Sequence, residues 1–170
     1  MTMENLQRKN VDNEGGYLRS QACGGATVNE LIGRKGRSVF TIAPEATVLE
    51  ALRSMSRHGV GALVAAEGGR VVGVISERDY ARKVILTGKS SDETSVAEIM
   101  GTPVNTVSPE QTVSECMEIM TAHHIRHLPV LKAGRLVGLV SIGDLVKSII
   151  SDQERQLEKF EQYVSGSYPT

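Results

Sequence analysis

Two short motifs in this chain place a serine three residues before an aspartate: Ser76 with Asp79, and Ser141 with Asp144. Each follows an apolar, β-branched run and opens a stretch with helical character. A carboxylate at such a place can accept hydrogen bonds from both hydroxyls of a ribose, and a helix N-terminus favours an anionic group. The same spacing is that of a capping box, in which both side chains only satisfy backbone N–H groups. The spacing alone leaves both interpretations open.

Both motifs belong to an internal repeat, and this repeat organises the chain. Residues 39–85 align without a gap with residues 104–150, at a constant offset of 65 residues (104 − 39). Ser76 falls on Ser141 and Asp79 on Asp144 in this alignment. Upstream, residues 27–32 resemble residues 95–100, so each copy is predicted to begin with a short helix.

Local patterns predict a β-α-β-β-α unit in each copy. Capping-box spacing after Thr47 and after Thr112 indicates the start of a helix. Apolar residues then recur at steps of three and four, as on one face of a helix: Val48, Ala51, Leu52 and Met55, then Val113, Cys116, Met117 and Met120. Two short apolar runs on either side of Gly68-Gly69 predict a hairpin. A second helix is expected to begin after Ser76.

The sequence therefore predicts an α+β fold of two repeats with additions at both ends. We expect a flexible N-terminal extension over residues 1–26, a first domain over residues 27–88, a linker with the second domain over residues 89–151, and a helical tail over residues 152–170. The tail carries apolar residues among charges. Capping the module and joining a partner chain are both compatible with this pattern, and we favour capping.

With these motifs in this order, the chain resembles the cystathionine-beta-synthase (CBS) domain family, and in particular small bacterial proteins made of one CBS pair. The diagnostic stretches are residues 73–79, 125–130 and 138–144. The resemblance implies that the two repeats pack sheet to sheet about a pseudo-twofold axis. It also implies two clefts for adenosine ligands, namely AMP, ADP, ATP, NAD(H) or S-adenosylmethionine, and a homodimer that regulates an unknown protein, with energy sensing as one such role.

The resemblance also assigns roles to residues. Asp79 and Asp144 would accept the ribose hydroxyls, and their serines would reach sugar or phosphate. The expected phosphate contacts are Arg78 or Arg82, Arg126 and His127; Thr41 and Thr106 would hold adenine through their backbone groups, and Ala62 and Pro129 would wall it. The first copy has Gly61-Ala62 where the second has Arg126-His127, so the fold does not demand these charges. The two clefts are therefore predicted to be non-equivalent.

Composition excludes several other functions. A formal net charge of -1 and an aromatic content of 4% argue against nucleic-acid binding. The sequence contains no activated nucleophile, no phosphate-binding glycine loop and no Cys/His metal spacing, so we expect neither catalysis nor a catalytic cofactor or metal. The absence of long apolar runs predicts a cytoplasmic protein that does not bind membranes. The alternative function is a protein-interaction adaptor in which one or both clefts are vestigial.

Overall fold

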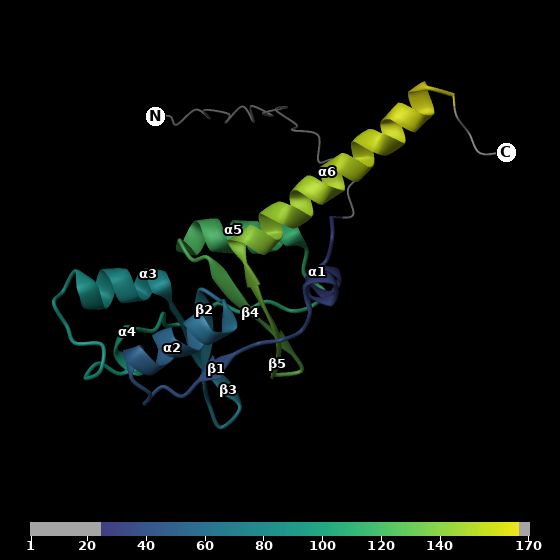
Figure 1. Cartoon of the computed structure of the whole chain (residues 1–170). Helices are drawn as coiled ribbons and strands as arrows, with labels where there is room; N and C mark the ends of the chain where they lie inside the picture. The colour runs from purple at the N-terminus through teal and green to yellow at the C-terminus, as the bar shows by residue number, and fades with distance from the viewer. Residues whose placement is uncertain (1–24, 167–170) are drawn as a thin grey trace, which may run out of the picture.

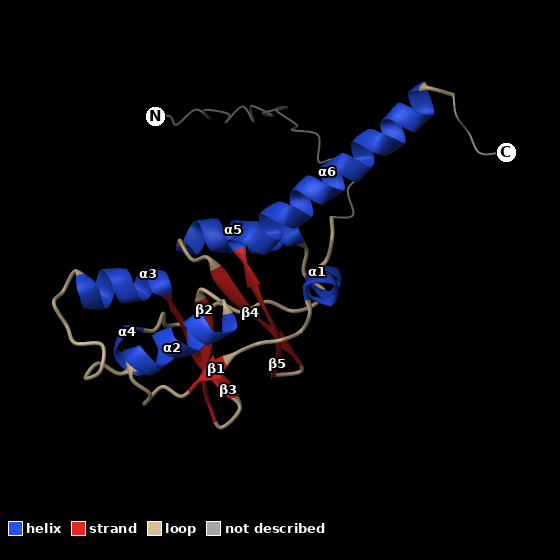
Figure 2. Cartoon of the chain, viewed as in Figure 1, coloured by secondary structure: helices blue, strands red, loops and turns tan. Residues whose placement is uncertain are grey.

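The computed structural model describes residues 25–166 as an α+β structure of two similar halves (Figures 1 and 2). The first half of the chain forms α1 (Val28–Lys35), β1 (Thr41–Ile42), α2 (Val48–His58), β2 (Ala62–Glu67), β3 (Arg70–Ser76), α3 (Glu77–Tyr80) and a π-helical turn, η1 (Ala81–Ile85). The second half forms α4 (Val96–Ile99), α5 (Val113–His123), β4 (His127–Lys132), β5 (Arg135–Ser141) and α6 (Ile142–Val164). All but the last two residues of the expected N-terminal extension lie outside the described residues.

The helices α2 and α5 begin where the sequence predicts them. Thr47 caps α2 and Thr112 caps α5, each in a reciprocal capping box with the glutamate three residues on. The apolar stripe of each helix supplies its buried face: Val48, Ala51 and Met55 in α2, and Val113, Cys116 and Met120 in α5. Both helices end at a left-handed residue, Gly59 and His124. The predicted elements are therefore confirmed for this part of each repeat.

The sheets differ between the repeats in one respect. In the first, β1 pairs in parallel with β2, and β2 pairs antiparallel with β3. In the second, β4 and β5 form the hairpin, but the expected entry strand is reduced to a single bridge between Val107 and Val130. The physical reason is Pro129, because the residue at the same repeat position, Val64, donates its backbone N–H to the carbonyl of Phe40 at 3.1 Å, and proline has no N–H to donate.

The two repeats exchange their first helices. The core of the second repeat, around Leu128 and Leu145, includes Val28, Leu31 and Ile32 of α1. The core of the first repeat likewise includes Val96 and Ile99 of α4. Two equivalent glycines make room for this exchange: a Cβ on Gly73 would lie 2.3 Å from Met100 Sδ, and one on Gly138 would lie 3.0 Å from Ile32 Cγ2. The helix that begins each repeat in the sequence therefore packs on the other repeat.

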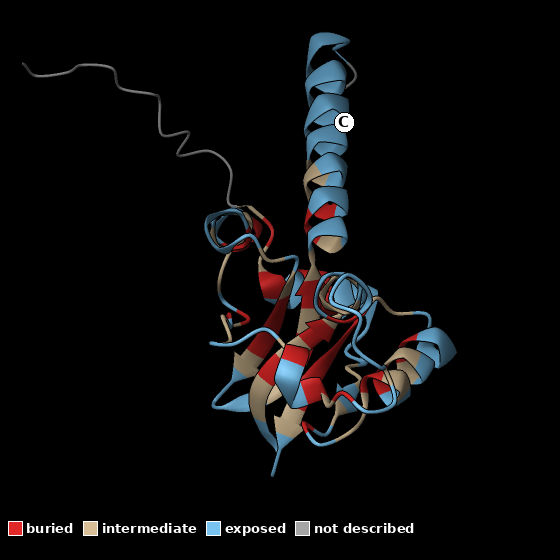
Figure 3. Ribbon diagram, turned by 90° about the vertical axis from the view of Figure 1, so that its left-hand side faces the viewer, coloured by how far each residue is buried: buried red, intermediate tan, exposed pale blue. Residues whose placement is uncertain are grey.

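The halves meet through their sheets, with β3 against β5, as the family resemblance implies (Figure 2). One element departs from this arrangement. Only the first turns of α6 pack on the body, where Leu145 and Ser148 are buried, and residues 153–164 are exposed (Figure 3). The expectation that the C-terminal tail caps the module is therefore wrong, because this part of the helix projects away from both cores.

Candidate functional site

A cavity of about 580 Å³ opens between the two repeats, and we call it the Asp79 cleft. Its size lies within the usual range of small-molecule sites, roughly 300–1,000 Å³. Three segments form its walls: the end of β3 with the helix that follows it, the chain between α4 and the second repeat, and the end of α5 with the start of β4. The lining residues are Gly61, Val74, Ser76, Glu77, Arg78, Asp79, Arg82, Lys83, Gly101, Thr102, Pro103, Val104, Asn105, His123, His124, Ile125, Arg126 and His127.

The carboxylate of Asp79 is held in a fixed orientation at the wall of this cleft. Its Oδ2 accepts hydrogen bonds from the backbone N–H of Ser76 at 3.0 Å and from the Ser76 hydroxyl at 2.6 Å. The hydroxyl in turn accepts the backbone N–H of Asp79 at 3.3 Å. The capping box is thus present, and it leaves Oδ1 on the side of the basic residues, 3.1 Å from Lys83 Nζ. A capping role and a ligand-binding role are therefore compatible in the same side chain.

Four basic side chains line the same cleft as this carboxylate. Arg78 reaches across the cleft and donates from one guanidinium nitrogen to the carbonyl of His124 at 3.4 Å, so it joins the two repeats. Lys83 donates to the carbonyl of Ile99 at 2.6 Å besides its pair with Asp79. Arg82 and Arg126 line the cleft from opposite repeats. Since Glu77 and Asp79 are the acidic residues of the lining, the cleft has an excess of positive charge that suits an anionic ligand.

His127 lies at the start of β4, where it pairs with Ser141 and lines the Asp79 cleft. Burial lowers the pKa of its imidazole below the ordinary value of 6.5, and the nearby Lys35 ammonium lowers the pKa further. The carboxylates of Asp144 and Asp79 act in the opposite direction but do not outweigh these effects. The fold therefore favours the neutral imidazole in the ligand-free protein, and any electrostatic contact with phosphate would strengthen as the pH falls.

The second aspartate, Asp144, has a different neighbour. Its Oδ2 accepts the Ser141 N–H and hydroxyl, both at 2.8 Å, as in the first repeat. It also accepts Lys35 Nζ at 2.5 Å, and the same ammonium donates to the carbonyl of Leu139 at 3.1 Å. Burial raises the pKa of the Asp144 carboxyl, but the bonds from Lys35 and Ser141 outweigh burial and leave this pKa below its ordinary value. Asp144 therefore already has an internal cation as its partner.

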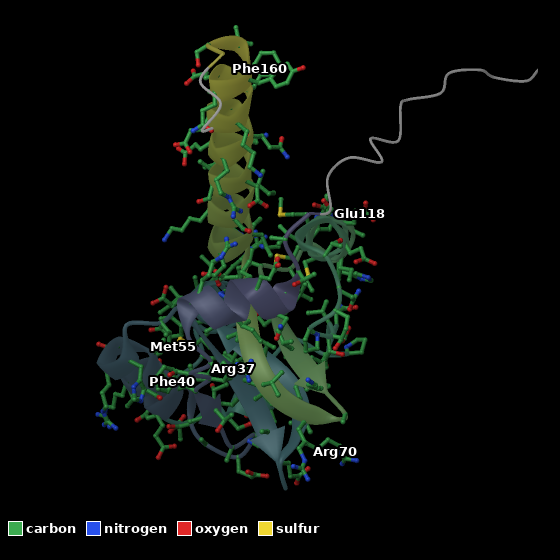
Figure 4. The ribbon with its side chains drawn as sticks, turned by 90° about the vertical axis from the view of Figure 1, so that its right-hand side faces the viewer. Arg37, Phe40, Met55, Arg70, Glu118 and Phe160 are labelled. Carbon is green, nitrogen blue, oxygen red and sulfur yellow. The ribbon has the colours of Figure 1, made fainter. Side chains whose placement is uncertain are left out.

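A ring pair further distinguishes the surroundings of the two aspartates. Phe40 and His58 stack with their centroids 3.8 Å apart and their planes at 16°. Phe40 lies on the segment between α1 and β1 (Figure 4). At the equivalent positions the second repeat has Asn105 and His123, which line the Asp79 cleft. The same repeat positions thus carry an aromatic stack in one half and polar lining groups in the other.

The structure brings half of the predicted site residues together in the Asp79 cleft: Ser76, Arg78, Asp79, Arg82, Arg126 and His127. The other six lie elsewhere. Ser141 and Asp144 occupy the equivalent place in the second repeat, Thr41 pairs with Val64, and Ala62 is buried beside Ser76. Thr106 is exposed one residue beyond the lining residue Asn105, and Pro129 is buried within β4. The roles suggested for these residues stay predictions.

Sequence reasoning missed the segment 101–105 and the residues His123 and His124, which all line the cleft. The segment lies in the cleft because the chain must return from α4, which packs on the first repeat, to the second repeat. The backbone N–H of Gly101 donates to the carbonyl of Val74 at 2.8 Å, and this bond holds the segment against β3. Without knowledge of the helix exchange, these residues appear to be only a linker.

Residues 25–166 give no support for a metal site, a reactive thiol or a membrane-spanning helix. They contain no group of three or more His, Cys, Asp or Glu side chains that could hold a metal ion. Cys116 is fully buried, and burial, followed by the charge of Glu115, raises the pKa of its thiol to about 11, which keeps it an unreactive thiol at neutral pH. No helix in this part of the chain is both long and apolar enough to cross a membrane.

Comparison with known proteins identifies the class. The CBS domain model matches residues 32–85 and 96–151, and the chain therefore belongs to the CBS domain family as a tandem pair. It is 39% identical over 152 residues to the mitochondrial CBS domain-containing protein CBSX3 of Arabidopsis thaliana, with 84% of this chain and 73% of that protein covered.

Solved structures agree with this assignment. A protein with CBS domains from Burkholderia ambifaria is 46% identical, with a TM-score of 0.71 over 75% of this chain and 96% of that one. The CBS domain protein PAE2072 from Pyrobaculum aerophilum, solved in complex with AMP, is 30% identical, with a TM-score of 0.62 over 70% of this chain and 89% of that one. The chain is thus a CBS pair, a regulatory type of module.

Proposed function

We propose that this protein is a non-catalytic sensor of adenosine nucleotides, with the Asp79 cleft as its principal binding site. The observation that carries the proposal is the Asp79 carboxylate, oriented by Ser76 at the wall of a cavity of about 580 Å³ that also holds basic side chains from both repeats. The carboxylate would accept the ribose hydroxyls, and the cations would meet the phosphate. The AMP complex of the Pyrobaculum protein favours AMP, with ADP, ATP, NAD(H) and S-adenosylmethionine as the other candidates.

The proposed mechanism is a population shift. A ligand in this cleft contacts the helix after β3 in the first repeat and the β4 entry in the second, so it favours one arrangement of the two repeats. In the ligand-free protein, Arg78 joins the repeats through the carbonyl of His124. A bound nucleotide would replace this single contact by several. Coupling free energies of this kind are typically about 1–3 kcal/mol, enough to modulate a partner protein.

Isothermal titration with AMP, ATP, NAD and S-adenosylmethionine tests the proposal. The decisive variant is Asp79→Asn, because asparagine keeps the shape and much of the capping capacity but loses the charge. The matched control is Asp144→Asn, the same change at the equivalent repeat position. We expect saturable binding of one ligand that is reduced at least tenfold by Asp79→Asn and little changed by Asp144→Asn. Absence of binding by the folded wild-type protein for all four ligands would overturn the proposal.

An adaptor function with vestigial clefts is the second candidate, and the Lys35–Asp144 pair favours it for that half of the molecule. Both aspartates are paired with a lysine ammonium, but the contact is shorter at Asp144, at 2.5 Å against 3.1 Å at Asp79, which makes Asp144 the less available of the two. The regulated partner would be a separate protein of unknown identity, and we expect the chain to form homodimers. A cytoplasmic location stays a prediction, since the Arabidopsis relative is mitochondrial.

A further inference from the structure

The exposed part of α6 carries a continuous apolar stripe. Ile142, Val146, Ile150, Leu157, Phe160 and Val164 are each between 38% and 68% exposed. From Val146 onward the stripe advances in alternating steps of four and three residues, with Gln153 as its polar member. This is the heptad spacing of helices that pair along their length. Phe160 marks the stripe near the far end of the helix, away from the body (Figure 4).

The stripe does not face the body of its own chain. α6 buries Leu145 and Ser148 against the second repeat, and these lie about a quarter of a turn and nearly half a turn round the helix from the stripe. The projecting residues 153–164 span about 18 Å at 1.5 Å per residue. An isolated helical segment of this length is marginal in water, and exposing large apolar side chains along it is unfavourable. The stripe therefore favours a partner surface, and its heptad spacing is typical of a partner that is itself a helix.

We propose that this partner is α6 of a second copy of the chain, paired in antiparallel orientation. With the two helices centred near residue 155, the stripe meets itself in matched layers. Val146 lies against Val164 of the second copy, Ile150 against Phe160, and the polar Gln153 against Leu157. Val146 and Ile150, near the base of the helix, are thereby each covered by an apolar residue from the tip of the other helix.

The charges beside the stripe favour this orientation. Lys147 and Glu161 flank the stripe on the same side, and the antiparallel register brings Lys147 of one copy beside Glu161 of the other, twice per dimer. In a parallel pair, Glu161 would instead face the neutral Gln156. The register also places Glu154 beside Glu154 of the second copy, an unfavourable contact at the exposed edge. Removing this contact should strengthen the dimer only if the helices are antiparallel, so it tests the orientation.

Sedimentation velocity of the full-length chain tests the pairing. We expect a dimer for the wild-type protein and a monomer for Leu157→Glu/Phe160→Glu. The matched control is Ser151→Glu/Gln162→Glu, which adds the same two charges on the opposite face of α6 and should leave the dimer intact. Thermal unfolding of both variants verifies that the CBS pair remains folded. A monomeric wild-type chain, or a dimer that survives Leu157→Glu/Phe160→Glu, overturns the proposal, since another protein or another face would then be involved.

A second variant tests the orientation. Glu154→Gln removes the like-charge contact only in the antiparallel register, so we expect it to tighten the dimer a few-fold at low salt and less at high salt. An unchanged dissociation constant overturns the antiparallel register. None of the substituted α6 positions lines the Asp79 cleft. Nucleotide titrations of the same variants therefore report on the sensor function independently of the dimer.

Discussion

Lys35 Nζ lies 2.5 Å from Asp144 Oδ2, although the two residues are 109 positions apart in the sequence. The helix exchange makes this contact possible, because α1 packs on the second repeat and ends beside the helix that Asp144 opens. In the first repeat the cation at Asp79 is Lys83, one turn along the same helix, and it lies in the lining of an open cavity. The two aspartates are therefore alike in sequence context but unlike in the origin of the ammonium beside them, which comes from the same helix at Asp79 and from α1 at Asp144.

Removing this ammonium should open the second half to nucleotide. In an Asp79→Asn background, we expect Lys35→Met to strengthen residual nucleotide binding by about fivefold, or about 1 kcal/mol, the upper end for a partly exposed ion pair. Lys89→Met is the matched control, because Lys89 also pairs with a carboxylate, Glu98, outside both halves of the site. Titration calorimetry measures the change. Weaker binding by Lys35→Met would show instead that the ammonium contacts the phosphate.

The β4–β5 hairpin contains a residue in a costly conformation. Ala133 has φ of 48°, and the equivalent residue in the β2–β3 hairpin is Gly68, with φ of 56°. Because a Cβ is disfavoured in the left-handed region, Ala133→Gly should raise the free energy of unfolding by about 1 kcal/mol. The reverse change, Gly68→Ala, should lower it by a similar amount, since its new Cβ meets no other atom. For a chain of this size, each change corresponds to about 2–4 °C in Tm.

His127 should make the stability of the protein depend on pH near neutrality. Its folded pKa lies below the ordinary value of 6.5, so the unfolded chain binds more protons than the folded protein as the pH falls through 6.5. The free energy of unfolding should therefore decrease as the pH falls through 6.5. The variant His127→Ala, which introduces the residue found in the first repeat, should show a smaller decrease in urea unfolding. An equal decrease in both proteins would assign the pH dependence to other groups.

Most of the local structure follows from the sequence because its determinants are local. The capping boxes of Thr47, Thr112, Ser76 and Ser141 all form, since each needs only residues one turn apart. The loss of the entry strand in the second repeat is not local, because its cause is a missing donor at Pro129, on the strand opposite. A pattern of apolar residues contains no information on that hydrogen bond.

Long-range placement is what the sequence did not reveal. The Ser76 and Asp79 part of the site was predicted from the repeat, and the structure adds segment 101–105 and the end of α5. Both additions depend on how the repeats face one another, as does the Lys35 contact. A motif that is duplicated in sequence therefore predicts two similar local structures, but the exchange of α1 and α4 decides which groups surround each of them.

The Arg126 side chain offers a test of the anionic end of the ligand. Its equivalent in the first repeat is Gly61, so removing the charge should not disturb the fold. We expect Arg126→Gln to weaken AMP binding by about tenfold at low salt, because a charge-assisted contact to phosphate is lost. The difference should shrink at high salt, since Arg126 is exposed and its field is screened.

The control is Arg135→Gln, at the start of β5 and outside the cleft lining, which should bind AMP as the wild type does. Equal affinities of the Arg126 variant and the wild type at both salt concentrations would place the phosphate at Arg78, Arg82 or Lys83 instead.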